Sequence, residues 1–399
     1  MAQDNHMTLL DDVLEKYADS LKISDSQFEE ARLRYESVGK WLQESTALKG
    51  RNPEIYAQGS FLLGTAIRPA SEEDRYDVDL VCCLSYLKNE ISQKDLKEKI
   101  GKELTDYALA KHMKNKPINK RRCWRMEYED DVNFHMDFLP SIPNQDAIYK
   151  KYLLESGVRE FLAQTSICFT DDKLGNYSRI DDNWLRTNPK GYAEWFKSRM
   201  KVVFEKGAMP LLEKRLYASV EAVPVHKIRT PLQKTIQLLK RHRDIMFGDD
   251  FKQKPVSMII NTLAAHAYQN EPGLIDALKR VVDDIDKYIE KDGARTIVRN
   301  PVMPEENFAD KWAEDPMLEK NFHAWLKKIR KDLDELLTKT SAKDMIEYLG
   351  VMFGSRIMGK VLEKCGYGTN SQKTSSVKSY PEVKINPSQP WSSNDSCWL

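Results

Sequence analysis

Two short segments, far apart in the chain, alternate between acidic and apolar residues, and this alternation constrains the fold more than any other feature. In residues 76–81, Asp77 and Asp79 are two positions apart, so on a β-strand both carboxylates project from one face while the intervening residues face the core. Residues 134–138 have the same period, with Asp137 on the polar face. The two segments therefore predict neighbouring strands whose carboxylates share one face of a sheet.

Three carboxylates in one place require a cation. They repel one another, and their pKa values would rise unless a positive charge neutralised them. Magnesium is the expected ion, with manganese able to substitute, because it takes oxygen ligands from one or two carboxylates and from substrate phosphates. Two such ions about 3.5–4 Å apart can stabilise the attacking and leaving oxygens of an in-line displacement. We therefore predict that Asp77, Asp79 and Asp137 bind the metal and are catalytic.

A glycine and a serine precede the first acidic strand. Gly59 lets the backbone approach phosphate oxygens closely, and Ser60 adds a hydroxyl donor. Taken alone, a Gly-Ser pair is most often an ordinary turn, and an Asp-x-Asp strand is most often a solvated sheet edge. The order of the two motifs, followed by a third acid in a β pattern, predicts a site for a nucleoside triphosphate.

The stretch from Gln58 to Pro69 resembles the nucleotidyltransferase superfamily that includes DNA polymerase beta, poly(A) polymerase, oligoadenylate synthase and cyclic GMP-AMP synthase. It is more closely similar to the bacterial cyclic-oligonucleotide synthases (CD-NTases) of the cGAS/DncV-like type, which also have a long spacer before the first acid. Two later blocks, within residues 238–260 and 300–312, match the same group. The resemblance spans roughly residues 56–312.

The resemblance implies an α+β fold: a polymerase-beta-like nucleotidyltransferase sheet with a long N-terminal spine helix, and a C-terminal helical lobe across a central cleft. Periodicity agrees with this bilobal plan. It predicts N-terminal helices with a break near Ser24, a β-rich segment, and a largely helical C-terminal half. Expected helices run over about 92–111, 275–291 and 317–337. The expected domains are a catalytic lobe over 1–225, a nucleotide-binding helical lobe over 226–365 and a disordered tail over 366–399.

Two residues of the helical half are candidates for the donor triphosphate. Thr230-Pro231 predicts a helix start, and Lys240 lies on the polar side of that helix. Ser257 falls near the start of a second helix, expected from Pro255 to about residue 268, where free N–H groups favour phosphate. By resemblance, Lys240 and Ser257 contact the triphosphate together with Gln58, Gly59 and Ser60. Their alternatives are a solvated surface lysine and a helix-capping serine.

Other polar residues have weaker signals. The loop over 300–312 is either a cover for a base, with Asn307 as the contact, or a structural crossover. The basic residues at 120–122 and Arg125 either contact phosphate or form the solvated edge of a loop.

Composition excludes some classes. A net charge of +1 and the lack of a Cys/His cluster with zinc spacing argue against a DNA-binding clamp, so we expect that activation requires no DNA. No apolar run approaches about 18 residues, and the first residues are not a secretion signal. The sequence therefore predicts a cytoplasmic protein without membrane contact.

The resemblance also implies the function. It is a magnesium-dependent synthesis of a cyclic di- or trinucleotide second messenger from nucleoside triphosphates, with release of pyrophosphate, in antiphage (CBASS-type) signalling. We expect ATP as substrate, with GTP as the second candidate, and a downstream effector that binds the product rather than the enzyme. The tail, which ends in Trp398-Leu399, is either a plain tail or a docking site for a HORMA-type regulator or a conjugation machinery.

Three alternatives share some of these features. A linear oligonucleotide synthase or RNA-tailing enzyme would use the same carboxylates. An antibiotic-modifying nucleotidyltransferase would need a small amine or alcohol as acceptor. A catalytically inactive nucleotide-binding scaffold is the third alternative, and the presence of all three acids argues against it.

Overall fold

The computed structural model describes residues 2–69, 76–128, 134–200, 229–248, 250, 253–355 and 361, and the side chains from residue 6 onward. The predicted boundary between the lobes at 225/226 and the predicted tail over 366–399 lie outside these residues. The proposed domain limits therefore stay a prediction.

A mixed sheet forms the centre of the catalytic half. In the described part of the chain it has seven strands in the order β1-β2-β5-β4-β3, and β6 and β7 extend it from β5. Strands β2 and β5 are parallel, and the other pairs are antiparallel. The strands are β1 (Glu54–Ala57), β2 (Tyr76–Cys83), β3 (Ile118–Asn119), β4 (Trp124–Tyr128), β5 (Phe134–Pro143), β6 (Ile167–Phe169) and β7 (Leu185–Thr187).

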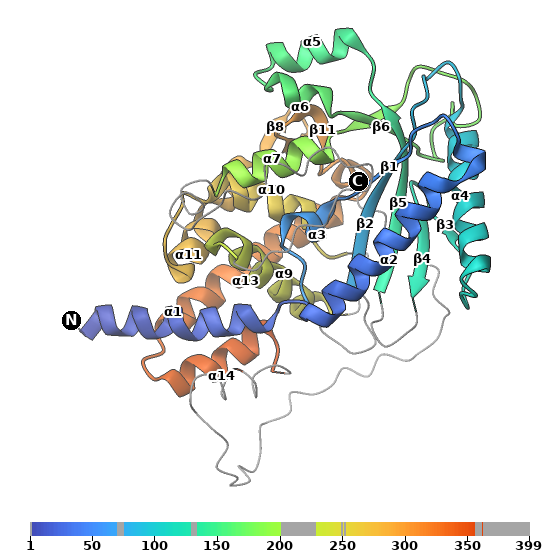
Figure 1. The fold of residues 1–399 in the computed structure, drawn as a ribbon. Coiled ribbons are helices and arrows are strands. Elements are labelled where there is room, and N and C mark those ends of the chain that lie inside the picture. The colour runs from blue at the N-terminus through green and yellow to red at the C-terminus, as the bar shows by residue number, and fades with distance from the viewer. Residues whose placement is uncertain are drawn as a thin grey trace.

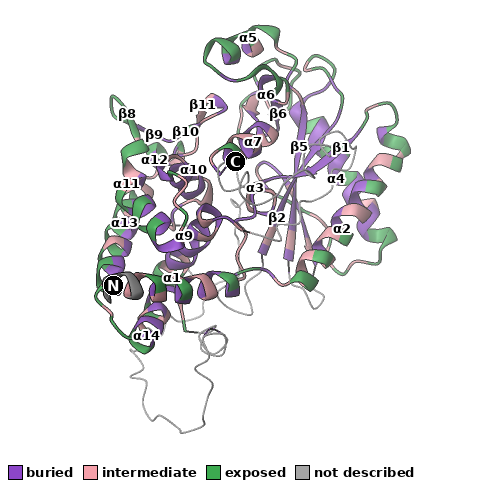
Figure 2. Cartoon of the chain, turned by 60° about the vertical axis from the view of Figure 1, so that its left-hand side comes forward, coloured by how far each residue is buried: buried purple, intermediate pink, exposed green. Residues whose placement is uncertain are grey.

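Two helices cover one face of this sheet, α2 (Asp25–Glu44) and α4 (Gln93–Ala110) (Figure 1). Their apolar residues pack with the apolar residues that alternate with polar ones along β2 and β5, such as Val78 and Met136. Figure 2 shows this burial: the strands are largely buried, and the helices that cover them have exposed residues on their outer sides. Helix α2 is thus the spine helix behind the sheet that the sequence predicted, and its partner α1 (Ala2–Ser20) is separated from it by the predicted break.

The other face of the sheet looks toward the helical half (Figure 1). One large apolar core joins α1 to the C-terminal helices and also includes residues of α5 and α7. The helices on this side are α3 (Gly59–Leu63), α5 (Ala147–Glu155), α6 (Glu160–Gln164), α7 (Pro189–Ser198), α9 (Pro231–Phe247), α10 (Ser257–Ala267), α11 (Leu274–Asp284), α12 (Lys311–Glu314), α13 (Pro316–Leu337) and α14 (Ala342–Phe353).

Local signals set several helix ends. Thr230 caps α9 in a capping box with Gln233, and Pro231 occupies the first helical position, as the sequence predicted. Ser92 caps α4 by accepting a hydrogen bond from the backbone N–H of Asp95. Short polar side chains at these positions accept backbone N–H groups that have no partner inside the helix.

One predicted helix ends too late. The pattern predicted a helix over 275–291, but α11 ends at Asp284, a 3-10 turn follows, and β8 (Glu290–Asp292) pairs with β9 (Arg295–Ile297). Gly293 turns between them at φ +57°, a conformation that glycine adopts readily. A second hairpin, β10 (Arg299–Asn300) with β11 (Met303–Asn307), follows. The helical half therefore also contains short strands, which its charged composition did not indicate.

Candidate active site

The parallel pairing of β2 and β5 brings the three acids together. Asp79 lies directly opposite Asp137, and Asp77 lies opposite His135, two positions along the strand. Residues directly opposite on neighbouring strands project to the same face of a sheet. The structure thus places the three predicted carboxylates on one face, at the side that looks toward the helical half.

The three carboxylates differ in their exposure. The side chain of Asp77 is 33% exposed, and that of Asp137 is 2% exposed. Burial raises the pKa of Asp79 well above its usual value, and the charges of Asp137 and Asp77 raise it further. Burial also raises the pKa of Asp137. The hydrogen bond that Arg125 donates acts in the opposite direction and lowers this pKa. These shifts are typical of carboxylates assembled to receive a cation.

Gly59 is in direct contact with one of these acids. It has φ +59°, and a Cβ atom built on it would lie 2.5 Å from Asp79 Oδ2. The neighbouring Gln58 donates its backbone N–H to the carbonyl oxygen of Asp79 over 2.8 Å. A side chain at position 59 would therefore fill the space beside the carboxylate. Only glycine tolerates both the backbone conformation and this close approach.

A buried arginine contacts two of the acids. Arg125 on β4 lies opposite Asp137, and it donates from Nε and Nη2 to both oxygens of that carboxylate at 2.7 Å. Its Nη2 also lies 3.4 Å from Asp77 Oδ1. The sequence offered two alternatives for Arg125, contact with phosphate or the solvated edge of a loop, and the second is wrong because the side chain is buried on a strand. The alternation of Trp124, Arg125 and Met126 is the signal that could have placed it on the polar face of a strand.

The donor atoms fit a magnesium ion that is shared with a substrate. Among the described residues, no three His, Cys, Asp or Glu side chains converge closely enough to hold a metal ion by themselves. Magnesium is bound in proteins through one or two carboxylates, and phosphates and water complete its octahedron. Asp77 and Asp79, beside the space that Gly59 leaves open, meet this requirement.

Basic side chains from the helical half lie next to the acids. Lys240 on α9 is buried and donates to the carbonyl oxygen and the hydroxyl of Thr65 at 3.2 and 3.3 Å. Burial lowers its pKa to about 7, the charge of Arg243 acts in the same direction, and the charges of Asp244 and Asp79 oppose it. Lys240 is therefore a buried amine near the carboxylates, and the alternative of a solvated surface lysine is wrong.

Ser257 begins α10 beside a second cationic group. Its hydroxyl accepts a hydrogen bond of 2.9 Å from Arg243, whose guanidinium also binds Asp244. Lys254 lies 3.4 Å from the same Asp244 oxygen. The alternative role of Ser257 as a helix-capping residue is wrong, because the capping position of α10 is Val256 and no side chain caps the helix there. Arg243 and Lys254 were not identified from the sequence as site residues.

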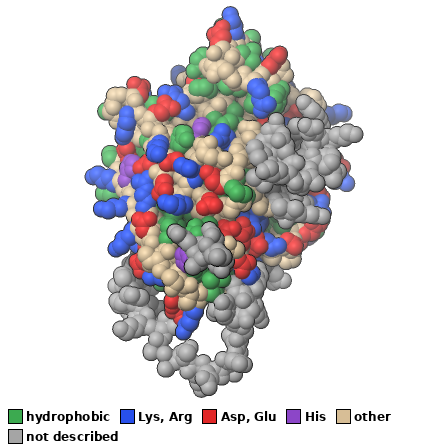
Figure 3. Space-filling view, turned by 90° about the vertical axis from the view of Figure 1, so that its left-hand side faces the viewer, with side chains coloured by type: hydrophobic (Ala, Val, Ile, Leu, Met, Phe, Trp, Pro, Cys, Tyr) green, Lys and Arg blue, Asp and Glu red, His purple; other side chains and the backbone are tan. Residues whose placement is uncertain are grey.

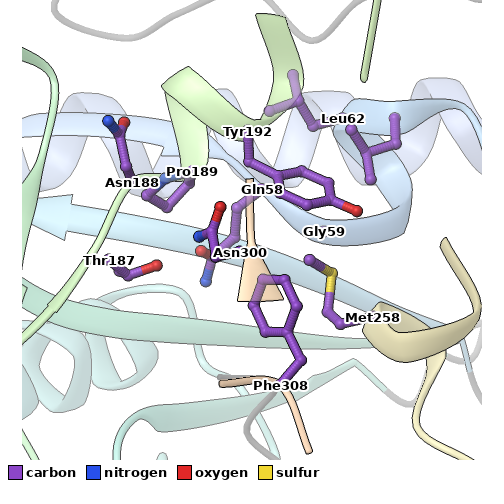
Figure 4. Close-up of a pocket in the computed structure, with 11 residues that line it drawn as sticks. Gln58, Gly59, Leu62, Thr187, Asn188, Pro189, Tyr192, Met258, Asn300 and Phe308 are labelled. Carbon is purple, nitrogen blue, oxygen red and sulfur yellow. The ribbon is translucent and has the colours of Figure 1, made fainter. Parts of the chain in front are cut away.

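An open pocket adjoins Gly59 (Figure 4). The rings of Tyr192 and Phe308 lie at its wall, 5.9 Å apart and nearly perpendicular. Polar atoms come from Gln58, Thr187 and Asn300. Aromatic faces with a few fixed polar groups suit a planar ring such as a nucleobase. The pocket and the row of acids thus share Gly59 as their common edge.

Residues 53–140, which include Gly59 and all three acids, match the family described as "Cyclic GMP-AMP synthase DncV-like, nucleotidyltransferase domain". These residues are a DncV-like nucleotidyltransferase domain. The chain is 26% identical over 372 residues to a c-di-GMP synthase of Roseivirga ehrenbergii, covering 92% of this chain and 90% of the relative. It is 24% identical to the cyclic dinucleotide synthase CdnG of Bradyrhizobium diazoefficiens, over 88% of this chain and 81% of the relative.

Solved structures share the fold of this nucleotidyltransferase. CdnG of Bradyrhizobium diazoefficiens in complex with GTP superposes with a TM-score of 0.67 at 20% identity, over 89% of this chain and 97% of the other. The Vibrio cholerae cyclic AMP-GMP synthase DncV, in complex with a linear intermediate, superposes with a TM-score of 0.54 at 16% identity, over 89% and 88% of the chains. The α+β fold with its N-terminal spine helix is thus confirmed.

Of the two roles that the sequence offered for the loop of Asn307, the contacts of Asn307 itself match the structural one. Asn307 accepts the backbone N–H groups of Val298 and Ala309 and donates to the carbonyl of Thr296, so it ties the hairpin loop to itself. The loop's contribution to the pocket comes from Asn300 and Phe308 instead. Asparagine is common in both roles, and only the folded loop distinguishes them.

The basic segment at 120–122 is not a solvated edge either. Arg121 and Arg122 each donate to Asp171 at 2.8 Å, and this aspartate is fully buried. The distant partner, about 50 residues away, could not be read from local sequence.

The visible outer face of the helical half carries acidic and basic side chains that are interspersed, without a large area of one sign (Figure 3). This face does not have the extended basic surface that binding to a DNA backbone needs. Among the described residues, no helix is both long and apolar enough to cross a membrane.

Proposed function

We propose that this protein joins nucleoside triphosphates into a cyclic dinucleotide second messenger and releases pyrophosphate. The observation that carries the proposal is the registered pair Asp79 and Asp137, with Gly59 against the first and the amine of Lys240 nearby. Carboxylates for a divalent cation and a basic group for phosphate, near enough for their charges to interact, support the proposal. A cyclic trinucleotide is the larger product that the same chemistry allows.

Asp77 and Asp79, with Asp137, are the proposed ligands of magnesium, for which manganese can substitute. A bound divalent ion would supply charge stabilisation for the phosphoryl group and for the attacking and leaving oxygens. The site supports this because the three carboxylates lie on one face and Asp77 is open to solvent.

The chain's own residues would hold the donor triphosphate. We assign its phosphates to the backbone of Gly59 and Ser60, to Lys240 and to the Ser257 hydroxyl, with Gln58 at the pocket edge. A ribose hydroxyl of the acceptor then attacks the α-phosphorus, one P–O bond forms, the bond to the β-phosphate breaks, and pyrophosphate leaves. Asp137 polarises the attacking hydroxyl, and the proton that this hydroxyl loses passes to solvent. A second reaction on the linear intermediate closes the ring, and positioning with electrostatics does most of the work.

The pocket that Tyr192 and Phe308 line is the proposed position of a base. The names of the relatives favour guanine, because one is a c-di-GMP synthase and the CdnG structure contains GTP. We therefore propose GTP as a substrate, and the expectation of ATP is tested beside it. Few hydrogen bonds decide such a choice.

Antiphage (CBASS-type) signalling is the proposed role, with an effector that binds the product. A HORMA-type regulator is the proposed partner of the tail, with a conjugation machinery as the second candidate. A distant relative supports the first, because CdnC of Escherichia coli has been solved with a HORMA protein (TM-score 0.55, 11% identity). We also propose that activity requires no DNA, since the net charge of the chain is only +1.

Incubation of the purified protein with all four nucleoside triphosphates and magnesium tests the proposal directly. Mass spectrometry is expected to detect a cyclic dinucleotide that contains guanine, together with pyrophosphate, and the product should resist phosphatase because a ring has no terminal phosphate. A phosphatase-sensitive product would indicate a linear synthase. Absence of any product from nucleotides alone would reject the proposal in favour of a scaffold or of an enzyme with another acceptor.

Substitution of Lys240 by methionine is expected to raise the KM for nucleotides about 10–100-fold, because a charge-assisted hydrogen bond contributes about 1.5–3 kcal/mol. The pKa of Lys240 is about 7, so the free amine is mostly neutral at pH 8. Bound phosphates raise that pKa again, and binding at pH 8 therefore takes up a proton. Calorimetry in buffers of different ionisation enthalpy measures this uptake.

Lys234→Met is the matched control on the same helix, since Lys234 pairs with Glu15 and Asp19 of α1. This variant should bind nucleotide with the proton uptake of the parent protein. Equal proton uptake in K240M and K234M would contradict the role given to Lys240.

A further inference from the structure

Arg125 does more than fill space beside the acids. It donates two hydrogen bonds of 2.7 Å that occupy both oxygens of Asp137, and its third contact reaches Asp77 at 3.4 Å. We propose that Arg125 is the internal cation of the site: it holds Asp137 in position, and a divalent ion must compete with it for that carboxylate. The inference depends on the metal use proposed above, and it concerns residues of this chain alone.

The sheet itself builds the arrangement. Arg125 lies opposite Asp137 on one side, and Asp79 lies opposite Asp137 on the other, so the three side chains form one row across β4, β5 and β2. Because the register of a sheet is fixed by many backbone hydrogen bonds, none of the three can move away along its strand. The guanidinium can leave Asp137 only by rotation of its own side chain.

The neighbours of Arg125 and Asp137 distinguish this pair from a structural ion pair. Both side chains are almost completely buried, 8% and 2% exposed, and buried charges must be paired. Asp137 also shares its face of the sheet with Asp79 and Asp77, and the charge of Asp79 is close enough to act on it. The guanidinium of Arg125 thus lies on one carboxylate of a group that we propose as metal ligands.

The contacts also predict an order of metal binding. Asp77 is the most open of the three acids, and its contact with Arg125 is longer than those of Asp137. An ion can bind at Asp77 and Asp79 while Arg125 keeps both of its hydrogen bonds to Asp137. An ion that uses Asp137 must share its oxygens with the guanidinium or displace it. Arg125 thus weakens metal binding by the substrate-free protein and keeps the third acid oriented for the reaction.

The test measures metal binding without nucleotide. In Arg125→Met the unfolding temperature in EDTA should fall, and millimolar MnCl₂ should raise it by about 4 °C or more beyond the shift in the parent protein. Calorimetry with MnCl₂ alone should give a Kd at least about 10-fold lower than that of the parent. In assays of pyrophosphate release, the magnesium concentration for half-maximal rate should fall, and so should kcat.

Arg122→Met is the matched control, because it removes a buried arginine from a buried aspartate in the neighbouring segment. Its unfolding temperature should also fall, but MnCl₂ should not restore it. The double variant R125M/D137N should lose the extra stabilisation by manganese, since the unpaired acid is gone. If R125M does not fold, R125K tests the same competition, because lysine lacks the planar fork that occupies both oxygens.

A manganese shift in R125M no larger than in the parent, or one that R122M reproduces, would overturn the inference. The unfolding measurements and the calorimetry with MnCl₂ use no substrate, so they are independent of which product the enzyme makes. Failure to detect a cyclic dinucleotide would reject the proposed function and leave the metal competition as measured.

Discussion

Replacement of Asp77 and Asp79 together by asparagine is expected to lower the rate of pyrophosphate release by at least about 1,000-fold, which corresponds to about 4 kcal/mol of transition-state stabilisation. Asparagine has nearly the same shape, but it removes both negative charges from the proposed metal site. Single-turnover assays with magnesium and with manganese measure the loss. A folded double variant that still forms oligonucleotides at more than about a hundredth of the parent rate would reject the assignment.

Folding of this double variant is the necessary control. Burial is the main cause that raises the pKa of Asp79, so folding is less favourable for its charged form than for its neutral form. The stability that this group contributes is present at low pH and is lost as pH rises through the raised pKa. The neutral amide avoids this loss, and the unfolding temperature in EDTA at pH 8 should not be below that of the parent. Asp106→Asn, on α4 behind the sheet, should leave the rate unchanged.

The change of Gly59 to alanine is expected to reduce the rate by about 100-fold or more and to destabilise the fold by about 1–2 kcal/mol. The destabilisation follows from φ +59° alone, because a left-handed conformation is unfavourable for alanine. The loss of rate has a second cause, since the new Cβ would lie 2.5 Å from Asp79 Oδ2 and must displace that carboxylate. Steady-state kinetics and chemical denaturation separate the two effects.

Gly293→Ala separates backbone strain from the clash. Gly293 has φ +57°, close to that of Gly59, but a Cβ atom there would meet nothing within 4 Å. This variant should lose similar stability and keep its rate. An equal loss of rate in both variants would show that the effect of G59A comes from general destabilisation and not from the position of Asp79.

Much of the architecture could be predicted because its signals are local. Thr230 and Pro231 indicated the start of α9, and the alternation of Asp77 and Asp79 with apolar residues indicated a strand with one polar face. The pairing of that strand with the segment of Asp137 was an expectation from pattern, and the register of β2 with β5 confirmed it. The predicted end of the helix over 275–291 was wrong, because the charged residues at its end suit an exposed hairpin as well as a helix.

The contacts between distant residues could not be predicted in the same way. Asn300 and Asn307 are chemically identical, yet the first lines the pocket and the second ties its own loop. Lys240 has the local signature of a surface lysine, and it is buried only because α9 packs next to Thr65. These differences arise when segments that are far apart in the chain meet.

The amino-acid order by itself determined which chemical groups this protein has and on which side of a strand or helix each one lies, because both depend on neighbours within a few residues. The tertiary structure alone decided that Arg125 donates hydrogen bonds to both oxygens of Asp137 and that Gly59 lies against Asp79. Those contacts depend on strand register and on burial, which raises or lowers the pKa of each group according to surroundings drawn from the whole chain.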